Sequence, residues 1–138
     1  MKRKLNCIML IDDSPDDNFF HERVIKKADC TEYIVTKENG VEALEFLASK
    51  AEHPEMHPDL IFLDINMPGM NGWDFLEEYN KLDKELQGKL VVIMLTTSTN
   101  PDDRVKARAM NIVSDFQSKP LTNEMLFGVI RTHFPDYF

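Results

Sequence analysis

No stretch of this sequence stays apolar for the roughly 20 residues that a membrane-spanning helix needs. The basic segment 2–4 is followed by an apolar run that ends at Asp12, so this run is about as long as a strand. It also lacks the small-residue cleavage site of a secretion signal. We therefore expect a cytoplasmic protein that makes no membrane contact.

Cysteine is scarce, and the chain has only two, Cys7 and Cys30. Their spacing is not that of a metal site, and we expect both as reduced core or surface thiols. His53 and His57 are a weak pair as well, because Pro54 prevents them from sharing a helical face. Zinc usually needs further ligands, which the local sequence does not offer. The sequence therefore predicts no zinc site.

Basic residues are in the minority, with 16 Lys and Arg against 24 Asp and Glu and a net charge of −8. Binding to nucleic acid without sequence preference depends on cationic surface, so this composition argues against direct DNA binding. The short basic segment 2–4 does not change the balance. The chain also lacks a glycine-rich phosphate loop ending in Gly-Lys-Ser/Thr, which excludes a P-loop NTPase.

What the sequence does contain is an alternation of strand-like and helix-like periods, repeated five times within 138 residues. This pattern is typical of an α/β fold in which helices cover both faces of a parallel sheet. The length suits one domain, which we expect over residues 1–138 with a core at about 5–134. The expected strands are 7–11, 32–37, 59–63, 90–95 and 113–118.

Side chains able to cap a helix stand in front of most of the expected helical segments. Ser14 and Pro15 begin the first helix, which runs to about Ala28. The second begins at Asn39, and Glu42 follows at the spacing of a capping box. Its apolar stripe is expected at Leu44, Leu47, Ala48 and Ala51.

The turn at residues 65–72 and the last two helices are also marked in the sequence. Proline and glycine make the turn rigid, so we expect it to present the preceding Asp64 to solvent. The helix that begins at Asn100 has a thin apolar stripe and many charges, and we expect it to be loosely held and largely exposed. Thr122 caps the last helix.

Polar side chains follow directly on four of the five expected strands. Asp12 and Asp13 close the first, Asp64 closes the third, Thr96 follows the fourth and Lys119 follows the fifth. The carboxyl ends of parallel strands meet at one edge of the sheet. We therefore expect three carboxylates and one ammonium in a single crevice, which suits a divalent cation and a phosphoryl group.

Each of these residues also has an ordinary alternative role. Asp12 and Asp13 can be the lead-in to a helix cap, and Asp64 and Thr96 can be plain polar groups at strand ends. Lys119 can be one of the many lysines that are simply solvated. Their joint placement at strand ends favours the functional interpretation over these alternatives.

Four segments together resemble one known family. They are residues 11–13 (Ile-Asp-Asp), 63–72 (Leu-Asp-Ile-Asn-Met-Pro-Gly-Met-Asn-Gly), 96–98 (Thr-Thr-Ser) and 119–120 (Lys-Pro). In this order and spacing they resemble the receiver domains of two-component response regulators, which have the fold of the bacterial chemotaxis regulator. The resemblance covers nearly the whole chain, and it implies a flavodoxin-like, doubly wound (βα)5 fold with a parallel sheet in the order 2-1-3-4-5.

The resemblance implies that Asp64 accepts a phosphoryl group from a phosphohistidine on a histidine kinase or phosphotransfer protein. It also implies Mg²⁺ as the cofactor, bound by Asp13 and Asp64 directly, by the backbone carbonyl of Asn66, and by Asp12 through water. A cation is needed on physical grounds too, because three neighbouring carboxylates repel one another. Lys119 would balance charge on the transferring oxygens.

The same resemblance implies how the signal leaves the domain. Thr96 and Phe116 would be the switch residues, and Phe116 lacks the tyrosine hydroxyl often found there, so its movement depends on packing. The readout surface is then the helix that begins at Asn100, the strand 113–118 and the last helix. The peptide bond between Lys119 and Pro120 is expected to be cis.

Phe138 ends the sequence shortly after the last expected helix, so we expect a single receiver domain without an output domain. Its partners would be the phosphoryl donor and a downstream protein target. Transfer of the phosphoryl group onward in a relay is an alternative that the sequence does not separate from target binding. A homodimer through the helix that begins at Asn100 is a further alternative.

Two other classes of protein compete with this interpretation. A phosphatase of the haloacid dehalogenase type also uses an aspartyl nucleophile and Mg²⁺. Such an enzyme has a general acid two residues after the nucleophile, where this chain has Asn66, and it lacks an acidic pair like that at residues 12–13. The second competitor is a phosphorylation-independent scaffold that keeps the receiver fold, and the complete set of site residues argues against it.

Overall fold

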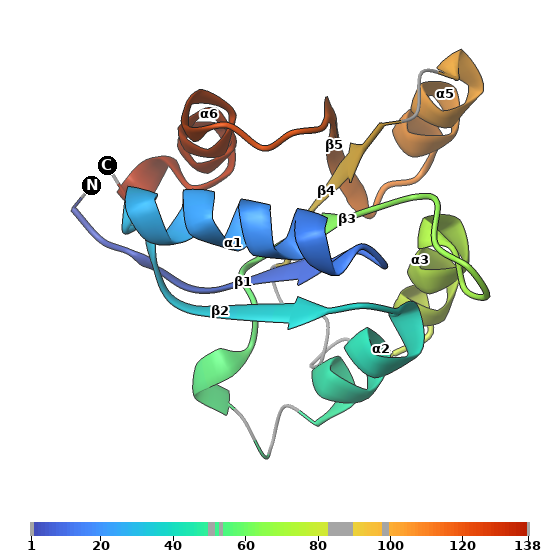
Figure 1. Cartoon of the computed structure of the whole chain (residues 1–138), viewed down its shortest axis with the longest axis horizontal. Helices are drawn as coiled ribbons and strands as arrows, with labels where there is room; N and C mark the ends of the chain where they lie inside the picture. Colours follow the sequence, from blue (N-terminus) through green and yellow to red (C-terminus); the bar gives the residue numbers. More distant parts are fainter. Residues whose placement is uncertain (1, 50–51, 53, 83–89, 98–99, 138) are drawn as a thin grey trace.

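A computed structural model describes residues 2–49, 52, 54–82, 90–97 and 100–137. Within these ranges, five parallel strands form one sheet in the order β2-β1-β3-β4-β5 (Figure 1). The strands are β1 (Leu5–Ile11), β2 (Thr31–Lys37), β3 (Leu60–Leu63), β4 (Val91–Thr96) and β5 (Val113–Ser118). Strand order and parallel pairing confirm the predicted doubly wound fold.

The three inner strands are almost continuously buried, whereas β2 and β5 at the two edges are partly exposed. A parallel strand with helices on both sides must be apolar at nearly every position. Alternate side chains of β1 supply the two faces of the sheet: Met9 and Ile11 join one core cluster, and Ile8 and Leu10 join the other. The sheet therefore separates two hydrophobic cores, one on each of its faces.

Helices cover both faces of this sheet. One face carries α1 (Pro15–Ala28) and α6 (Asn123–His133), and the opposite face carries α2 (Gly40–Ala48), α3 (Gly72–Asn80) and α5 (Pro101–Ala109). Two short 3-10 helices, η1 (Pro54–Met56) and η2 (Pro135–Tyr137), complete the described elements. None of the helices within the described ranges has the length and apolar character needed to cross a bilayer.

The predicted cap residues act as caps. Each accepts a hydrogen bond from a main-chain N–H in the first turn of its helix, and the four are Ser14, Asn39, Asn100 and Thr122. A complete capping box occurs where it was not predicted, at the start of α3. There Asn71 accepts from the N–H of Asp74 at 2.9 Å, and the Asp74 carboxylate accepts from the N–H of Asn71 at 3.2 Å. This box fixes the end of the turn that follows β3.

The apolar stripe predicted for the second helix was partly wrong. Ala48 is exposed, and Ala51 lies outside the described residues. Leu47 is buried and Leu44 packs partly against the core, as predicted, and the other buried residues of α2 are Gly40 and Ala43. A pattern based on apolar side chains overlooks Gly40, which is buried because Met70 packs closely over it. The expected exposure of the helix that begins at Asn100 is confirmed, since Ala107 is the one buried residue among those of α5. That the helix is loosely held stays a prediction.

Both cysteines are free and buried. Burial raises the pKa of Cys7 to about 12 and that of Cys30 to about 11, so both thiols stay protonated at neutral pH. Of the two histidines for which a zinc site was considered and rejected, His53 lies outside the described residues. Within the described ranges, the one cluster of possible metal ligands consists of carboxylates that follow β1 and β3.

Gly72 lets α3 begin directly against the main chain that follows β3. Its N–H donates to the carbonyl oxygen of Ile65 at 2.8 Å, which closes the turn on itself. A Cβ at position 72 would lie 2.5 Å from the carbonyl oxygen of Asp64 and 3.0 Å from the Cα of Ile65. Both are main-chain atoms that cannot rotate away, so the turn depends on a residue without a side chain.

We expect Gly72→Ala to lower the free energy of unfolding by about 1–3 kcal/mol, because the methyl group overpacks against main chain. Gly128→Ala is the matched control: Gly128 lies in α6, and an added Cβ meets nothing within 4 Å. This control should gain about 0.5–1 kcal/mol from its better helix propensity. Urea unfolding measures both values, and equal stability of the two variants would contradict the role given to Gly72.

Candidate functional site

The carboxylates predicted at the strand ends do come together. Asp12 follows β1 and Asp64 follows β3, and these strands are neighbours in the sheet. The N–H of Asp64 donates to the carbonyl oxygen of Ile11 at 3.0 Å, which continues the strand ladder up to the site. Carboxylate oxygens of Asp12, Asp13 and Asp64 all lie within 4.8 Å of one another. The sheet thus holds three negative charges at one point of its carboxyl edge.

The prediction that the turn presents Asp64 to solvent was wrong. Asp64 is 6% exposed and Asp12 is 4% exposed, whereas Asp13 is the open member of the group. The reason lies in the turn after Asp64, which packs Ile65 and Met67 into the core instead of standing away from the sheet. Access to the site is therefore from the side of Asp13.

Lys119 is the cation of the site. Its ammonium lies 2.5 Å from Asp12 Oδ2, 2.9 Å from Asp17 Oδ2 and 3.6 Å from Asp64 Oδ2, and its side chain is only 9% exposed. Burial lowers the pKa of Lys119, but the hydrogen bonds to Asp12 and Asp17 outweigh burial and raise the pKa above its usual value. The ammonium is therefore charged at any physiological pH.

The pKa of Asp64 is raised above its usual value. Burial of the carboxyl is the main cause, and the charges of Asp12 and Asp13 add to it. Lys119 and the hydrogen bond from the N–H of Ile65 to Asp64 Oδ1, at 2.9 Å, act in the opposite direction. The charged form of Asp64 is thus disfavoured by burial and favoured by the neighbouring ammonium.

The donor set of the site fits magnesium. Mg²⁺ prefers oxygen ligands and keeps several of its waters, so it suits a site with a few carboxylates and one open side. Here the carboxylates are within reach of one another, and Asp13 lies on the open side. Asn66, whose carbonyl was predicted as a ligand, is exposed two residues after Asp64. The three carboxylates carry more negative charge than Lys119 neutralises.

Thr96 lies at the same edge, at the end of β4. It is completely buried, and its carbonyl oxygen accepts a hydrogen bond from the N–H of Lys119 at 2.9 Å. Thr96 also pairs with Ser118 across the β4–β5 ladder. The main chain therefore links Thr96 to the lysine directly. The peptide bond between Lys119 and Pro120 is cis, the geometry expected for it.

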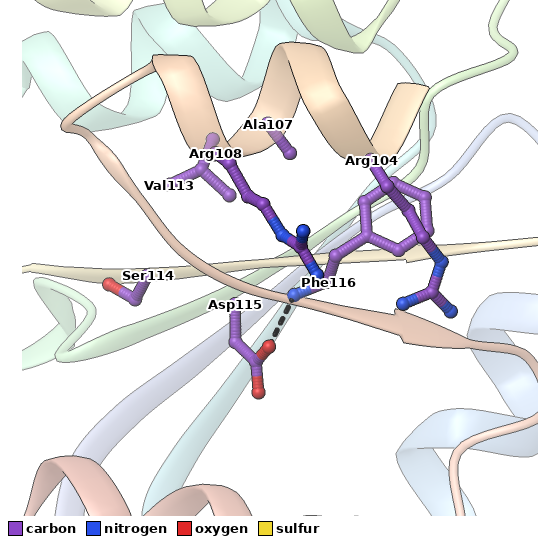
Figure 2. A pocket seen from close by; sticks show the side chains of 7 residues that line it. All are labelled: Arg104, Ala107, Arg108, Val113, Ser114, Asp115 and Phe116. Carbon is purple, nitrogen blue, oxygen red and sulfur yellow. Dashed lines mark hydrogen bonds between the residues drawn. The ribbon is translucent and has the colours of Figure 1, made fainter. Parts of the chain in front are cut away.

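Phe116 lies on β5, where it pairs with Met94 of β4 and packs partly against the core. The guanidinium of Arg104 lies over its ring, 5.0 Å from the ring centre. Figure 2 shows both side chains beside Arg108, where α5 and β5 enclose a cavity of about 300 Å³. Phe116 is thus half-buried between the sheet and a cationic helix face.

Three residues of α1 belong to this region but were not predicted there. Asp17 lies in the first turn of α1 and binds Lys119. Asn18 and His21 are both buried, with exposed fractions of 5% and 3%. Burial and the charge of Lys119 lower the pKa of His21. The spacing Asn18, His21, Ile25 marks the inward face of α1 and was the available signal.

The comparisons with known proteins agree with this geometry. Residues 8–131 match the model of the response regulator receiver domain family. The chain belongs to the response regulator receiver family. It is 31% identical to the protein PilG of Pseudomonas aeruginosa over 132 residues, which covers 94% of this chain and 88% of PilG. It is 30% identical to the response regulator Rcp1 of Synechocystis over 106 residues, covering 76% of this chain and 71% of Rcp1.

Solved structures also place the chain among response regulators. A two-component response regulator from Cytophaga hutchinsonii superposes with a TM-score of 0.87 at 31% identity, covering 96% of this chain and 99% of that one. Receiver domains are signalling switches of two-component systems and are generally not classical enzymes. They typically bind Mg²⁺ at an acidic pocket, and they interact with histidine kinases or phosphotransfer proteins and with downstream effectors.

Replacing Lys119 with methionine removes the cation that opposes burial at Asp64 in this receiver domain. We expect the pKa of Asp64 to rise further, because burial and the charges of Asp12 and Asp13 then act with less opposition. Carboxyl ¹³C NMR during a pH titration measures the change. Lys81→Met is the control, since Lys81 pairs with Glu78 on the surface and should leave the Asp64 titration unchanged. An Asp64 titration that is identical in Lys119→Met and the wild type would refute this account.

Proposed function

We propose that this receiver domain is a phosphorylatable switch in which Asp64 accepts a phosphoryl group from a phosphohistidine. The observation that supports the proposal is the meeting of three carboxylates within 4.8 Å beside the buried ammonium of Lys119. Neighbouring carboxylates repel one another, and a phosphoryl group brings further negative charge. The arrangement makes sense for a site that recruits a divalent cation and then an anion.

The two oxygens of Asp64 have different surroundings, which suits a nucleophile. Oδ1 accepts the hydrogen bond from Ile65, and this contact holds the carboxylate in one orientation. Oδ2 lies on the side of Lys119, 3.6 Å from the ammonium. In the transfer, an Asp64 oxygen forms a bond to phosphorus while the bond from phosphorus to the histidine nitrogen breaks. The chemistry needs positioning and charge balance more than acid–base groups.

Mg²⁺, when bound, supplies positive charge beside the phosphoryl oxygens. We propose Asp13 and Asp64 as its direct ligands, together with the backbone carbonyl of Asn66, and Asp12 as a ligand through water. Lys119 balances negative charge at Asp12 and Asp64, beside which its ammonium lies. Because Lys119 is held by Asp12 and Asp17, its ammonium is already in place before any donor arrives.

The switch residues of the proposal are Thr96 and Phe116. A hydroxyl at position 96 donates to the new phosphoryl oxygens, and strand pairing carries a movement of β4 to β5, where Phe116 lies opposite Met94. Inward movement of Phe116 takes its ring away from Arg104 and reshapes the cavity between α5 and β5 (Figure 2). Phosphorylation shifts this equilibrium only by its different affinity for the two states.

The readout surface of the proposal consists of α5, β5 and α6. α5 is exposed along most of its length, so its position can respond to β5 at little cost in core packing. We propose that the chain acts as a single receiver domain that signals to a protein target or passes the phosphoryl group onward. A homodimer through α5 is a third use of the same surface.

Asp64→Asn is the direct test of the acceptor. We expect the wild type to gain one phosphoryl group from acetyl phosphate or phosphoramidate only when Mg²⁺ is present, and the variant to gain none. Intact-mass spectrometry measures both. Asp136→Asn is the matched control, because Asp136 is exposed on η2 and should leave the reaction unchanged. A wild type that takes no phosphoryl group, and no beryllofluoride either, would favour the phosphorylation-independent scaffold.

Thr96→Val tests the coupling between the site and the readout surface. The variant should still accept a phosphoryl group, because Asp64 and Lys119 are unchanged. We expect the beryllofluoride-induced changes in the amide NMR signals of β5 and α5 to be largely lost, since the hydroxyl that contacts the phosphoryl oxygens is gone. Thr97→Val is the neighbouring control, at an exposed position. Full transmission of the change to Phe116 in Thr96→Val would contradict the proposed switch.

A further inference from the structure

Two polar side chains of α1 lie behind the acidic site, and the phosphoryl-transfer proposal does not use them. Asn18 and His21 are one turn apart on the inward face of α1, with exposed fractions of 5% and 3%. They occupy positions at which a helix that packs on a sheet normally carries apolar residues. Burial of polar groups is costly unless their hydrogen bonds are made, so their presence calls for partners.

The side-chain amide of Asn18 donates two hydrogen bonds but accepts none from the described residues. Its Nδ2 donates to the carbonyl oxygen of Asp12 at 2.9 Å and to that of Lys37 at 3.3 Å, so it ties the carboxyl ends of β1 and β2 to α1. Its Oδ1 is buried and has no hydrogen-bond partner among the described residues. The amide therefore has a fixed orientation and one acceptor that needs a donor.

A small cavity lies between α1 and the inner strands, directly beneath the acidic site. Its polar lining consists of Asn18, His21, Asp12 and Asp64, and its volume is about 10 Å³. This is close to the roughly 10–15 Å³ that the centre of one water molecule needs. The rest of the lining is apolar and consists of Leu10, Ile11, Phe62 and Leu95. The polar side chains nevertheless offer the two to four partners that a buried water needs.

We propose that this cavity is a binding site for one ordered water molecule, and that His21 is a positioning residue that holds the acidic site through it. The water donates one hydrogen to Asn18 Oδ1 and the other to a carboxylate oxygen of Asp12 or Asp64. It accepts a hydrogen bond from the ring N–H of neutral His21. Three bonds are the usual number for a buried water, and each group then has a suitable partner.

Such a water would give the carboxylates an additional hydrogen-bond donor on the side that faces α1. Asp64 Oδ1 is already held by the N–H of Ile65, and Asp12 Oδ1 accepts from the N–H of Ser14 at 3.0 Å. A water fixed by α1 adds a donor that does not depend on the binding of cation or phosphoryl group. Groups that orient metal ligands in this way typically change metal affinity by about 10–100-fold when removed. The effect on Mg²⁺ is independent of phosphorylation, and only a rate effect would depend on the proposed function.

Three variants separate positioning from packing. His21→Leu removes the ring N–H at similar volume, and His21→Gln keeps an N–H donor. Ile25→Ala is the control, because Ile25 is buried one turn further along the same face of α1 and does not line the cavity. We measure Mg²⁺ affinity by calorimetry, stability by urea unfolding, and the wild-type cavity by high-resolution crystallography.

We expect His21→Leu to bind Mg²⁺ about 10–100-fold more weakly and His21→Gln to recover most of that loss. Ile25→Ala should be less stable than the wild type, with unchanged Mg²⁺ affinity. The wild-type crystal should show a water within about 3.2 Å of Asn18 Oδ1. A dry cavity, an unchanged affinity in His21→Leu, or an equal loss of affinity in Ile25→Ala would each overturn the proposal.

If His21→Leu does not fold, the wild-type crystal still tests the proposal, because it shows whether the cavity of the unaltered chain holds a water. Failure of the proposed function is a separate result. A wild type that takes no phosphoryl group while His21→Leu still weakens Mg²⁺ binding would remove that function and leave this inference standing. Normal phosphorylation with a dry cavity would remove this inference alone.

Discussion

The repulsion among carboxylates at one edge of the sheet is the constraint on which the rest of the site depends. Asp12 and Asp64 are nearly buried, so water screens their charges poorly, and Asp13 lies close to both. Lys119 relieves part of this repulsion and also binds Asp17, so three carboxylates surround one ammonium. Asp13 adds a fourth negative charge close to Asp12 and Asp64. A surplus of negative charge of this kind agrees with the Mg²⁺ binding that is typical of receiver domains.

The positions of the strand-end residues could be predicted from the sequence because they depend only on the strand that each residue follows. A polar side chain that follows directly on a buried parallel strand must lie at the carboxyl edge, and this rule found Asp12, Asp64 and Lys119 without knowledge of distant contacts. The strand order came from the resemblance to receiver domains. The cap residues were equally readable, since a cap acts within a few residues of its own position.

Features that depend on packing between distant segments could not be read in the same way. The burial of Asp64 depends on how the following turn packs Ile65 and Met67, and the rigidity of a turn does not reveal its direction. Asp17 has a complete local explanation at the start of a helix, which hides its bond to Lys119. His21 differs, because its spacing from Ile25 marked the inward face of α1 and was not used.

The bond between Lys119 and Asp17 joins positions that are 102 residues apart in the chain. A contact of such wide separation carries an entropic cost of loop closure, which the packing of the folded domain must offset. Lys119 reaches the carboxylates through the pairing of β5 with β4 and the packing of α1 on the sheet. A chain in which β5 is not paired with β4 holds the carboxylates without their internal cation, so the acidic site is complete only in the folded domain.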